Sequence, residues 1–560
     1  MDPVSSIVSL PAIPPMPEPL HAWYDSAEVV ETLAGFNEHL ETLWHGRVGA
    51  LENMRADGRD TFWWPFTQHG NVDDDSKVTM IDSACGDNFH VVKDGNDGEL
   101  ARDALMDSCA SWWTQGVGHG EPSMALASAA AAGRYGHVIF PDVVHSPALE
   151  LSKKLVGPQG PGDGWASRVF FSDDGSTAME VGIKMGMKTY QKWHGLSSAE
   201  ADEYDWIVCA QQDCYHGDTL GVMDVAEPSV FNEGQHPWFE PKGLFLETPT
   251  LGFADGELQI TLNDGTTQAF ESIDGVMDVE DRLKSELYFR YVSEIETLWD
   301  ECDGSIGPHN KPRRIGSLVI EPVLMGAGGM KFIDPLWQRA LIDVARSKRV
   351  PVVFDEIAAG LYRVGVRSCR EILDANPDIA SYAKLLTGGL VPLSVTLATE
   401  DVFETFLGDE KGQALLHGHS YTANPIGCVS AIHALETYNE VLEKNDKGDE
   451  RQLFDVEQVR ELSHLAVVQQ SFSLGTVLAV TIAPEEGGQT GYAAAARTTP
   501  MVRALRDKGI YARPLGNVIY IMASPLTSRE ECARLANTLK DTIVEFMDSN
   551  GIDAPSRYAT

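Results

Sequence analysis

Basic residues are scarce in this chain of 560 amino acids. It has 43 Lys and Arg against 83 Asp and Glu, which gives a formal charge of −40 at pH 7. Nucleic acids and anionic membrane surfaces bind concentrated Lys and Arg, so this balance argues against both as partners. The sequence also lacks a continuous apolar run long enough to cross a bilayer. We therefore expect neither a nucleic-acid-binding protein nor a membrane protein.

Cysteine is sparse as well. The eight cysteines form no Cys-x-x-Cys pair and no regular framework, which is typical of free thiols in a reducing compartment. The first thirty residues contain four acidic residues and no Lys or Arg, and they lack a basic segment followed by an apolar core. They therefore resemble neither a secretory signal nor a mitochondrial presequence. The sequence as written predicts a cytoplasmic protein.

Short apolar runs alternate with helical patterns through the middle of the chain. The runs are Val169–Phe171, Trp206–Cys209, Leu318–Ile320 and Val350–Phe354. Buried strands that alternate with helices favour a mostly parallel sheet covered by helices on both faces. After about Ala434 the helices alternate with further strand patterns, which indicates a smaller α+β domain. The predicted fold class is therefore α/β, with a large and a small domain.

Four segments follow from these patterns. We predict an N-terminal leader or linker arm over 1–61, an N-terminal segment of the small domain over 62–110, a large cofactor-binding domain over 111–433, and a C-terminal small domain over 434–560. The leader includes a helical pattern from Ser26 to Met54. An acidic insertion covers about 251–314, with a hairpin-like pattern before Asp264-Gly265 and a helical pattern from Val279 to Trp299.

Lys384 and Asp355 are the strongest candidate catalytic residues in the sequence. Asp355 ends the apolar run Val350–Phe354, and α/β sheets bind ligands beyond the carboxyl ends of their strands. A lysine amine can hold pyridoxal phosphate, and an aspartate can keep its pyridine nitrogen protonated, so that the ring accepts electrons from a breaking C–H bond. Alone, the two residues have the ordinary interpretations of a solvated lysine and a helix cap. Together they predict pyridoxal phosphate as cofactor and both residues as catalytic.

A candidate anion site lies at Asp174-Gly175-Ser176-Thr177, between a predicted strand and a predicted helix. Open N–H groups and the positive end of the helix dipole make such a junction favourable for phosphate. An ordinary helix cap is the alternative for this motif in isolation. Beside Lys384, we predict that Gly175 and Ser176 bind the cofactor phosphate.

Eight ordered blocks extend this pattern from Phe62 to about Leu539. The blocks are Trp63–His69, Ser111–Trp113, Asp174–Glu180, Tyr215–Thr219, Ile320–Pro322 with Gly326–Met330, Asp355–Gly360, the segment around Lys384, and Arg513–Gly516. On these blocks the chain resembles the class III, fold-type I aminotransferases. Within that class it is most similar to members that convert 8-amino-7-oxononanoate to 7,8-diaminononanoate in biotin biosynthesis, with S-adenosylmethionine as amino donor. The resemblance implies the same reaction here.

The resemblance also implies further cofactor contacts. Tyr215 is expected against one face of the pyridine ring, where stacking needs a flat aromatic surface. Glu321 is expected near the cofactor, and a purely structural hydrogen bond is an equal interpretation of this residue. Ser420 is expected to reach the phosphate from the partner subunit, which implies a homodimer.

Six residues are expected to bind substrate on the same grounds. Trp112 and Trp113 match a tryptophan pair that lines the substrate channel, and Arg513 matches the arginine that receives the substrate carboxylate. The remaining three are Phe66, which stands where bacterial members have a tyrosine, Arg363 near the donor side, and Gly418 within His417-Gly418-His419-Ser420. The His-x-His spacing suggests a metal site, but no third ligand is evident, and we predict none.

The leader and the insertion resemble those of eukaryotic versions fused to dethiobiotin synthetase. The sequence has no Gly-x-x-x-x-Gly-Lys-Ser/Thr loop, so we expect the aminotransferase half alone, with a synthetase as fused or separate partner. Such relatives also leave a mitochondrial location open. Three alternatives remain: another class III ω-aminotransferase acting on ornithine, 4-aminobutyrate or β-alanine; an aminomutase; and an inactive scaffold or binding subunit.

Overall fold

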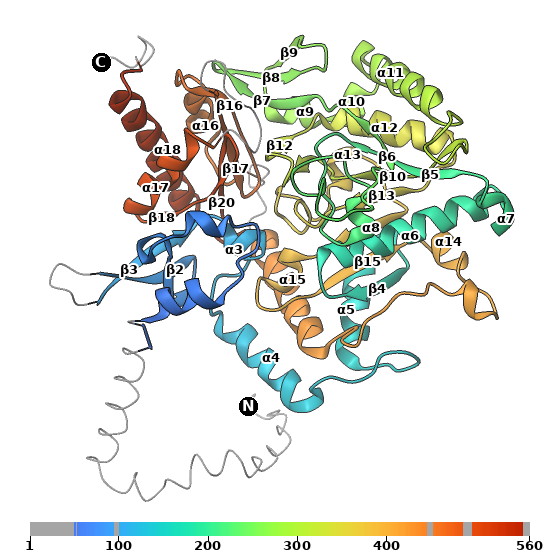
Figure 1. The fold of residues 1–560 in the computed structure, drawn as a ribbon, viewed down its shortest axis with the longest axis horizontal. Helices are drawn as coiled ribbons and strands as arrows, with labels where there is room; N and C mark the ends of the chain where they lie inside the picture. Colours follow the sequence, from blue (N-terminus) through green and yellow to red (C-terminus); the bar gives the residue numbers. More distant parts are fainter. Residues whose placement is uncertain (1–49, 52, 95–99, 445–451, 485–494, 553–560) are drawn as a thin grey trace, which may run out of the picture. The chain divides into compact units, whose positions relative to one another are not determined.

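The computed structural model describes residues 50–51, 53–94, 100–444, 452–484 and 495–552 (Figure 1). These residues belong to two compact units. The first contains the chain up to Ser83 and His90–Asp103, and the second contains Ala84–Phe89 and the chain from Ala104 onward. Most of the predicted leader and of its helical pattern lies outside the described residues.

The first unit is built from short elements. It contains helical residues 53–61 and the 3-10 helices η2 (His69–Asn71) and η3 (Asp75–Lys77). It also contains most of the strands β1 (Met80–Cys85) and β2 (Asn88–Asp94) and the first half of β3 (Leu100–Asp107). Asp74 begins η3 by accepting a hydrogen bond from the Ser76 N–H at 2.8 Å. A short acidic side chain at this position satisfies a backbone donor that the helix leaves open.

The central sheet of the second unit has seven strands in the order β4-β15-β14-β13-β10-β5-β6. Their bounds are β4 (Arg168–Ser172), β5 (Asp205–Gln211), β6 (Gly243–Leu246), β10 (Arg313–Ile320), β13 (Val352–Asp355), β14 (Ile379–Tyr382) and β15 (Ser394–Ala398). Neighbours pair in parallel, except that β15 is antiparallel to both β14 and β4. Buried side chains on both faces explain why these strands read as continuous apolar runs. The predicted mostly parallel sheet is confirmed.

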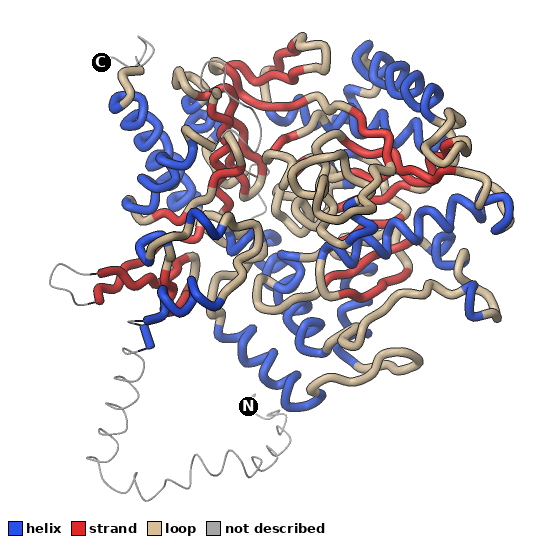
Figure 2. The backbone as a smooth tube through the Cα atoms, in the orientation of Figure 1, coloured by secondary structure: helices blue, strands red, loops and turns tan. Residues whose placement is uncertain are grey.

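Helices lie on both sides of this sheet (Figure 2). Helix α6 (Gly175–Trp193) packs against β4, β10, β13, β14 and β15. It carries glycine where it meets the sheet: a Cβ at Gly186 would lie 2.6 Å from Ser317 Oγ. This close approach packs the middle of α6 directly against β10.

A second seven-stranded sheet has the order β19-β20-β17-β16-β7-β8-β9. Its strands are β7 (Thr250–Ala254), β8 (Glu257–Thr261), β9 (Thr267–Phe270), β16 (Val468–Leu474), β17 (Val477–Ile482), β19 (Pro514–Leu515) and β20 (Val518–Met522). The predicted insertion hairpin is present as β8 and β9. The sequence did not indicate that β7 would pair with β16, which joins the insertion to the C-terminal strands.

The remaining elements are short helices, connecting strands and the helices of the C-terminal region. They are α3 (Ala110–Trp113), α4 (Pro122–Tyr135), α5 (Ser146–Val156), α7 (Ser198–Ala201), α8 (Leu220–Met223), α9 (Ile273–Met277), α10 (Val279–Arg282), α11 (Glu286–Cys302), β11 (Leu324–Met325), β12 (Lys331–Phe332), α12 (Pro335–Ser347), α13 (Arg370–Leu373), η4 (Lys384–Thr387), α14 (Glu400–Glu404), η5 (Lys411–Gln413), α15 (Pro425–Lys444), α16 (Val456–Leu462), α17 (Thr498–Asp507), β18 (Ile510–Tyr511) and α18 (Arg529–Ser549).

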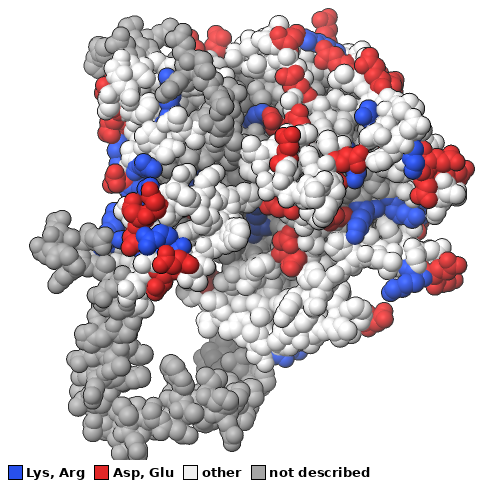
Figure 3. All heavy atoms as spheres, viewed as in Figure 1, with Lys and Arg blue, Asp and Glu red and all other residues white. Residues whose placement is uncertain are grey.

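Acidic side chains are prominent on the face shown in Figure 3, especially over the region of α7 and α11, and basic side chains lie among them singly or in small groups. In the described part of the chain, no helix combines the length and the apolar character needed to span a bilayer.

A buried carboxylate ties the insertion helices to α12. Asp334 is 0% exposed, and its two oxygens accept from the Arg282 guanidinium at 2.7 and 2.9 Å. It also accepts from the Tyr291 hydroxyl at 3.0 Å and begins α12 by accepting from the Leu336 N–H at 3.0 Å. Every lone-pair direction of this charge is therefore occupied, which offsets the cost of burying it.

We expect Asp334→Ala to leave the Arg282 charge buried without a counter-charge. The free energy of unfolding should fall by about 3–5 kcal/mol, as for other broken buried ion pairs. Urea denaturation measures this loss. Asp278→Ala is the matched control, because Asp278 is an exposed helix cap that accepts only from the Asp281 N–H, and its loss should cost about 1 kcal/mol. Equal losses in the two variants would contradict the anchoring role.

Candidate active site

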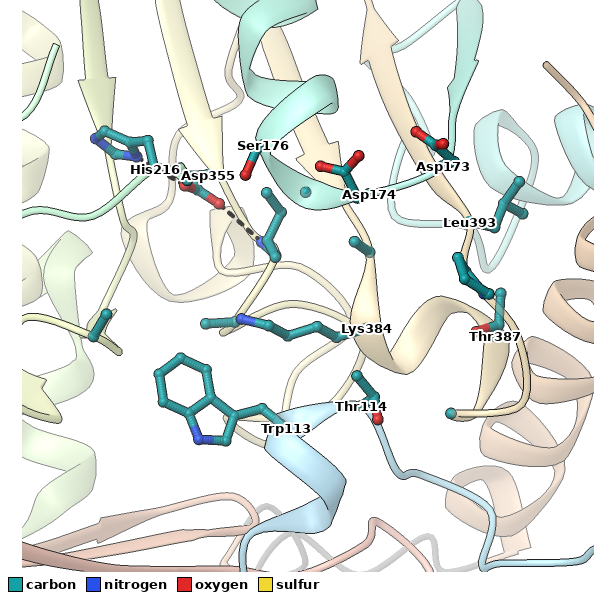
Figure 4. A pocket seen from close by; sticks show the side chains of 18 of the residues that line it. Trp113, Thr114, Asp173, Asp174, Ser176, His216, Asp355, Lys384, Thr387 and Leu393 are labelled. Carbon is teal, nitrogen blue, oxygen red and sulfur yellow. Dashed lines mark hydrogen bonds and ion pairs between the residues drawn. The ribbon is translucent and has the colours of Figure 1, made fainter. Parts of the chain in front are cut away.

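A cavity of about 450 Å³ opens where the central strands end. Residues that follow β4, β5, β10, β13 and β14 line it, together with the segment after β3 (Figure 4). Parallel strands bring their carboxyl ends to one edge of a sheet, so side chains far apart in sequence meet there. Seven predicted site residues line this cavity: Trp113, Gly175, Ser176, Tyr215, Glu321, Asp355 and Lys384.

Lys384 is the first residue of η4 and follows β14 after a single residue. Its side chain extends across the cavity over the Trp113 indole, and Nζ lies 4.3 Å from the centroid of that ring (Figure 4). Burial lowers the pKa of Lys384 to about 8, although the Asp355 and Glu321 carboxylates act in the opposite direction. A substantial fraction of the amine is therefore neutral near physiological pH, which is the form that attacks a carbonyl carbon.

Asp355 is the last residue of β13 and is 4% exposed. One carboxylate oxygen accepts from His216 Nδ1 at 2.8 Å, and the other accepts from the Ile357 N–H at 3.1 Å. Burial by itself lowers the pKa of His216, but Cys214 and the Asp355 carboxylate raise it well above its ordinary value. His216 therefore donates to Asp355 and stabilises its charged form. That charge suits a carboxylate facing a protonated pyridine nitrogen.

The start of α6 has the features of a phosphate site. Asp174 accepts from the Thr177 N–H at 3.0 Å, while the earlier N–H groups of the first turn have no carbonyl partner within the helix. Ser176 Oγ accepts from the Asp218 N–H at 3.0 Å. A Cβ at Gly217, whose φ is 129°, would lie 2.1 Å from Ser176 Oγ. The glycine therefore keeps this anion cradle open, and the residues present fit the phosphate of the predicted cofactor.

Glu321 holds the backbone beside Tyr215. One of its oxygens accepts from the Tyr215 N–H at 2.9 Å, and the other accepts from the Gly326 N–H at 3.0 Å. Burial raises the pKa of Glu321 to about 7, and the nearby Asp355 charge adds to the effect. The Tyr215 ring meets Phe231 edge to face, with centroids 6.0 Å apart. Glu321 thus has the structural hydrogen bonds that the sequence left open, and its contact with the cofactor stays a prediction.

Trp112 and Arg513 form a pair outside the residues that line the cavity. The Arg513 guanidinium lies 5.3 Å from the centroid of the Trp112 indole. Arg363, the expected donor-side contact, is 0% exposed. Its guanidinium donates to the carbonyls of Trp113, Gln115 and Ala523 and to the Thr476 hydroxyl. Arg363 therefore braces the segment that carries the tryptophans, and its contact with substrate stays a prediction.

Three predicted residues lie elsewhere. Gly418 and Ser420 are in the segment between η5 and α15 and do not line the cavity of their own chain. Phe66 belongs to the first unit, where its φ is 52°. Their roles stay predictions. In the described ranges of the chain, no group of three or more His, Cys, Asp and Glu side chains is arranged to hold a metal ion.

Sequence reasoning gave no role to two buried groups, His216 and Glu356. Glu356 is 1% exposed and accepts from the Tyr382 hydroxyl and the Cys369 N–H, both at 2.8 Å, and from the Ser368 hydroxyl. Burial raises the pKa of Glu356 to about 7. Its contact with Tyr382 links the end of β13 to the strand that leads to Lys384. In the sequence, His216 follows Tyr215 and Glu356 follows Asp355, but nothing in the local pattern indicates their hydrogen-bond partners.

The segment that carries the tryptophans has an unusual backbone. Ala110, Ser111, Trp112 and Trp113 all have positive φ, at 44°, 44°, 64° and 74°. The left-handed region costs roughly 1–2 kcal/mol per non-glycine residue, so four in succession need support from neighbouring groups.

Comparison with known proteins places the chain in a family. A family model described as Aminotransferase class-III matches residues 87–543. The chain is 38% identical, over 96% of its length, to "Bifunctional dethiobiotin synthetase/7,8-diamino-pelargonic acid aminotransferase, mitochondrial" of Arabidopsis thaliana, and it spans 65% of that relative. It is 30% identical, over 86% of its length, to the adenosylmethionine-8-amino-7-oxononanoate aminotransferase of Synechococcus elongatus, of which it covers 98%.

A solved structure with the same fold is the crystal structure of adenosylmethionine-8-amino-7-oxononanoate aminotransferase from Methanocaldococcus jannaschii. The TM-score is 0.70 at 23% identity, and the match covers 88% of this chain and 99% of that chain. The predicted fold class is confirmed by this likeness.

The lowered pKa of Lys384 predicts how its reactivity depends on pH. Covalent trapping of pyridoxal phosphate by borohydride at Lys384, followed by peptide mass spectrometry, should rise with pH and reach half its maximum near pH 8. Glu321→Gln removes a charge that raises this pKa, so its curve should shift to lower pH. A midpoint near the ordinary lysine pKa of about 10.4, or no shift in the variant, would contradict the assignment.

Proposed function

Since the chain belongs to the class III aminotransferase family, we propose that it aminates 8-amino-7-oxononanoate to 7,8-diaminononanoate, with S-adenosylmethionine as amino donor. The family match confirms pyridoxal phosphate as the predicted cofactor. The observation that carries the proposal is the meeting of Lys384, Asp355 and the start of α6 in one cavity. The names of the relatives from Arabidopsis thaliana and Synechococcus elongatus support the choice of substrate.

Each group of the site has a task in this proposal. Pyridoxal phosphate supplies an aldehyde that takes up the amine and a ring that accepts electrons. Neutral Lys384 takes a proton from the substrate carbon and returns it. Asp355, held by His216, keeps a negative charge against the pyridine nitrogen, and the N–H groups of Gly175 and Ser176 bind the phosphate.

The proposed keto substrate has a long apolar chain that ends in a carboxylate. Trp113 is 6% exposed and offers a flat apolar wall beside Lys384. The neighbouring Trp112 lies next to Arg513, whose guanidinium suits a carboxylate because it donates two parallel hydrogen bonds. Trp113, which forms the wall, and Trp112, which lies beside the Arg513 cation, are thus adjacent residues. This arrangement supports a substrate that is apolar along its length and anionic at its end.

A homodimer belongs to the same proposal. Large apolar side chains are exposed on and after α4, including Leu126, Ile139 and Val144, the last at 73%. Tyr421 is also exposed and lies against His137, with ring centroids 4.8 Å apart. A second copy that covers this surface would remove the apolar side chains from water, and would let Ser420 reach the phosphate of the neighbouring site.

The relatives also suggest where the chain works. The Arabidopsis thaliana relative combines the aminotransferase with a dethiobiotin synthetase, so a synthetase, fused or separate, is the proposed partner. The name of that relative includes "mitochondrial". The proposed location of this chain is the cytoplasm, with the mitochondrion as the alternative.

Lys384→Ala should abolish turnover and the visible absorption of the covalently held cofactor. In the wild type, S-adenosylmethionine should discharge that absorption, whereas ornithine, 4-aminobutyrate and β-alanine should not; the opposite preference would favour another ω-aminotransferase. Full turnover in Lys384→Ala would overturn the proposal.

Arg513→Ala should load cofactor normally but raise the KM for 8-amino-7-oxononanoate by about 10–100-fold, as expected for a lost charge-assisted pair.

Mixed dimers test the contribution of Ser420. Ser420→Ala should bind cofactor about tenfold more weakly, because one hydrogen bond to a charged phosphate is lost. A heterodimer of Lys384→Ala and Ser420→Ala subunits, purified through two different tags, then contains one intact site if Ser420 acts across the interface. At limiting cofactor it should show about half the wild-type activity. Activity no higher than that of the separate variants would show that Ser420 serves its own subunit or neither.

A further inference from the structure

One left-handed turn determines where both tryptophans of the site lie. Residues 110–113 are all left-handed, and the turn directs Trp113 to Lys384 Nζ and Trp112 to Arg513. In an extended strand, adjacent side chains would point to opposite faces. The positions of the two indoles therefore depend on whatever holds this backbone in place.

We propose that Asp107 is the positioning residue that holds this turn and thereby shapes the substrate channel of the proposed function, on which this inference rests. Asp107 is the last residue of β3 and is 4% exposed. One oxygen accepts from the Cys109 N–H at 3.3 Å, and the other accepts from the Ser111 hydroxyl at 2.8 Å. The carboxylate thus joins the end of the strand to the interior of the turn.

A second set of hydrogen bonds fixes the tautomer of His119, which contacts Asp107. Gln115 Oε1 accepts from the N–H groups of Gly116, Val117 and Gly118 at 2.8, 3.0 and 2.9 Å, so its Nε2 must point away from them. That Nε2 lies 3.2 Å from Nδ1 of His119, to which it donates. Nε2 of His119 then carries the proton and donates to Asp107 at 2.9 Å.

Asp107 is therefore surrounded by donors only. Ser111, His119 and the Cys109 N–H all give it a proton, which is the pattern that a carboxylate satisfies. An amide of the same shape would place an NH₂ group against at least one of these donors. The charge of Asp107, and not only its size, is what the site requires.

The other end of the turn is held independently. The Trp113 N–H donates to the Cys109 carbonyl at 2.9 Å, and Arg363 donates to the Trp113 carbonyl at 3.1 Å. Strained backbone persists only where its surroundings over-determine it. Without the acceptors of Asp107, residues 110–113 are free to relax toward negative φ, and the two indoles then turn away from Lys384 and Arg513. The cofactor-binding residues lie on other strands and do not contact Asp107.

Asp107→Asn should therefore separate substrate recognition from cofactor loading. We expect visible absorbance to show cofactor occupancy within about twofold of the wild type, while the Kd for 8-amino-7-oxononanoate rises by about 10–100-fold, the scale set by misplaced groups in a binding pocket. The tryptophan bands in near-ultraviolet circular dichroism should change as well. Asp455→Asn is the matched control, because Asp455 caps α16 through the Gln458 N–H and does not line the cavity. Asp455→Asn should alter neither cofactor occupancy, nor the Kd for 8-amino-7-oxononanoate, nor the tryptophan bands.

A double-mutant cycle distinguishes positioning from general stability. Trp112→Phe should weaken substrate binding in the wild-type background. In the Asp107→Asn background the same substitution should reduce substrate affinity much less, because the indole is already displaced. Ser111→Ala, which removes one bond to Asp107 and keeps its charge, should give a smaller loss in the same direction, and it serves if Asp107→Asn does not fold.

The role of Asp107 would be overturned if the losses of substrate affinity in Trp112→Phe and Asp107→Asn were additive. Normal substrate binding with unchanged tryptophan bands in Asp107→Asn would overturn it as well. An error in the substrate assignment gives a different result. If the wild type does not bind 8-amino-7-oxononanoate, the proposed substrate is wrong, and Asp107 is then judged by circular dichroism alone. The spectral change in Asp107→Asn should then coincide with bands lost in Trp112→Phe and Trp113→Phe, and its absence there would reject the positioning role.

Discussion

The site depends on a balance of buried charges at the end of β13. The Asp355 carboxylate is removed from water, and both of its oxygens accept hydrogen bonds, one from His216 and one from the Ile357 N–H. The same charge acts on Lys384, whose own burial favours the neutral amine. A buried carboxylate without such donors would take up a proton, and it could then no longer face a protonated ring. The hydrogen bond between His216 and Asp355 therefore supports both the proposed electron sink and the reactivity of the lysine.

The large negative charge of the chain constrains how an anionic cofactor can be held. With 43 basic residues against 83 acidic ones, the overall field does not attract phosphate. The proposed cradle solves this locally, because it uses backbone N–H groups and the positive end of α6 rather than a cluster of lysines. Glycine at position 217 keeps the next segment close to Ser176 without filling that space.

Precise placement of the aromatic residues comes from polar groups beneath them. Glu321 uses both oxygens to hold the backbone at Tyr215 and Gly326. Asp107 and Arg363 hold the two ends of the tryptophan turn. In each case a buried ionisable side chain forms hydrogen bonds with the segment that carries an aromatic side chain. The positions of the aromatic side chains therefore depend on hydrogen bonds formed by buried groups behind them.

The sequence alone was sufficient for the α/β class, the family and the meeting of Lys384, Asp355, Gly175 and Tyr215. The class and the positions of Asp355 and Gly175 follow from local signals, because residues after parallel strands share one edge of the sheet. The family and the place of Tyr215 were expected from the resemblance of the ordered motifs. The partner of His216, the burial of Arg363 and the pairing of the insertion with β16 were decided only by tertiary structure. The left-handed turn after Asp107 belongs with them. Each of these features depends on contacts between residues far apart in the chain, or on backbone angles that many sequences can adopt. Such contacts and angles produce no periodic pattern in the sequence, so the sequence alone does not predict them.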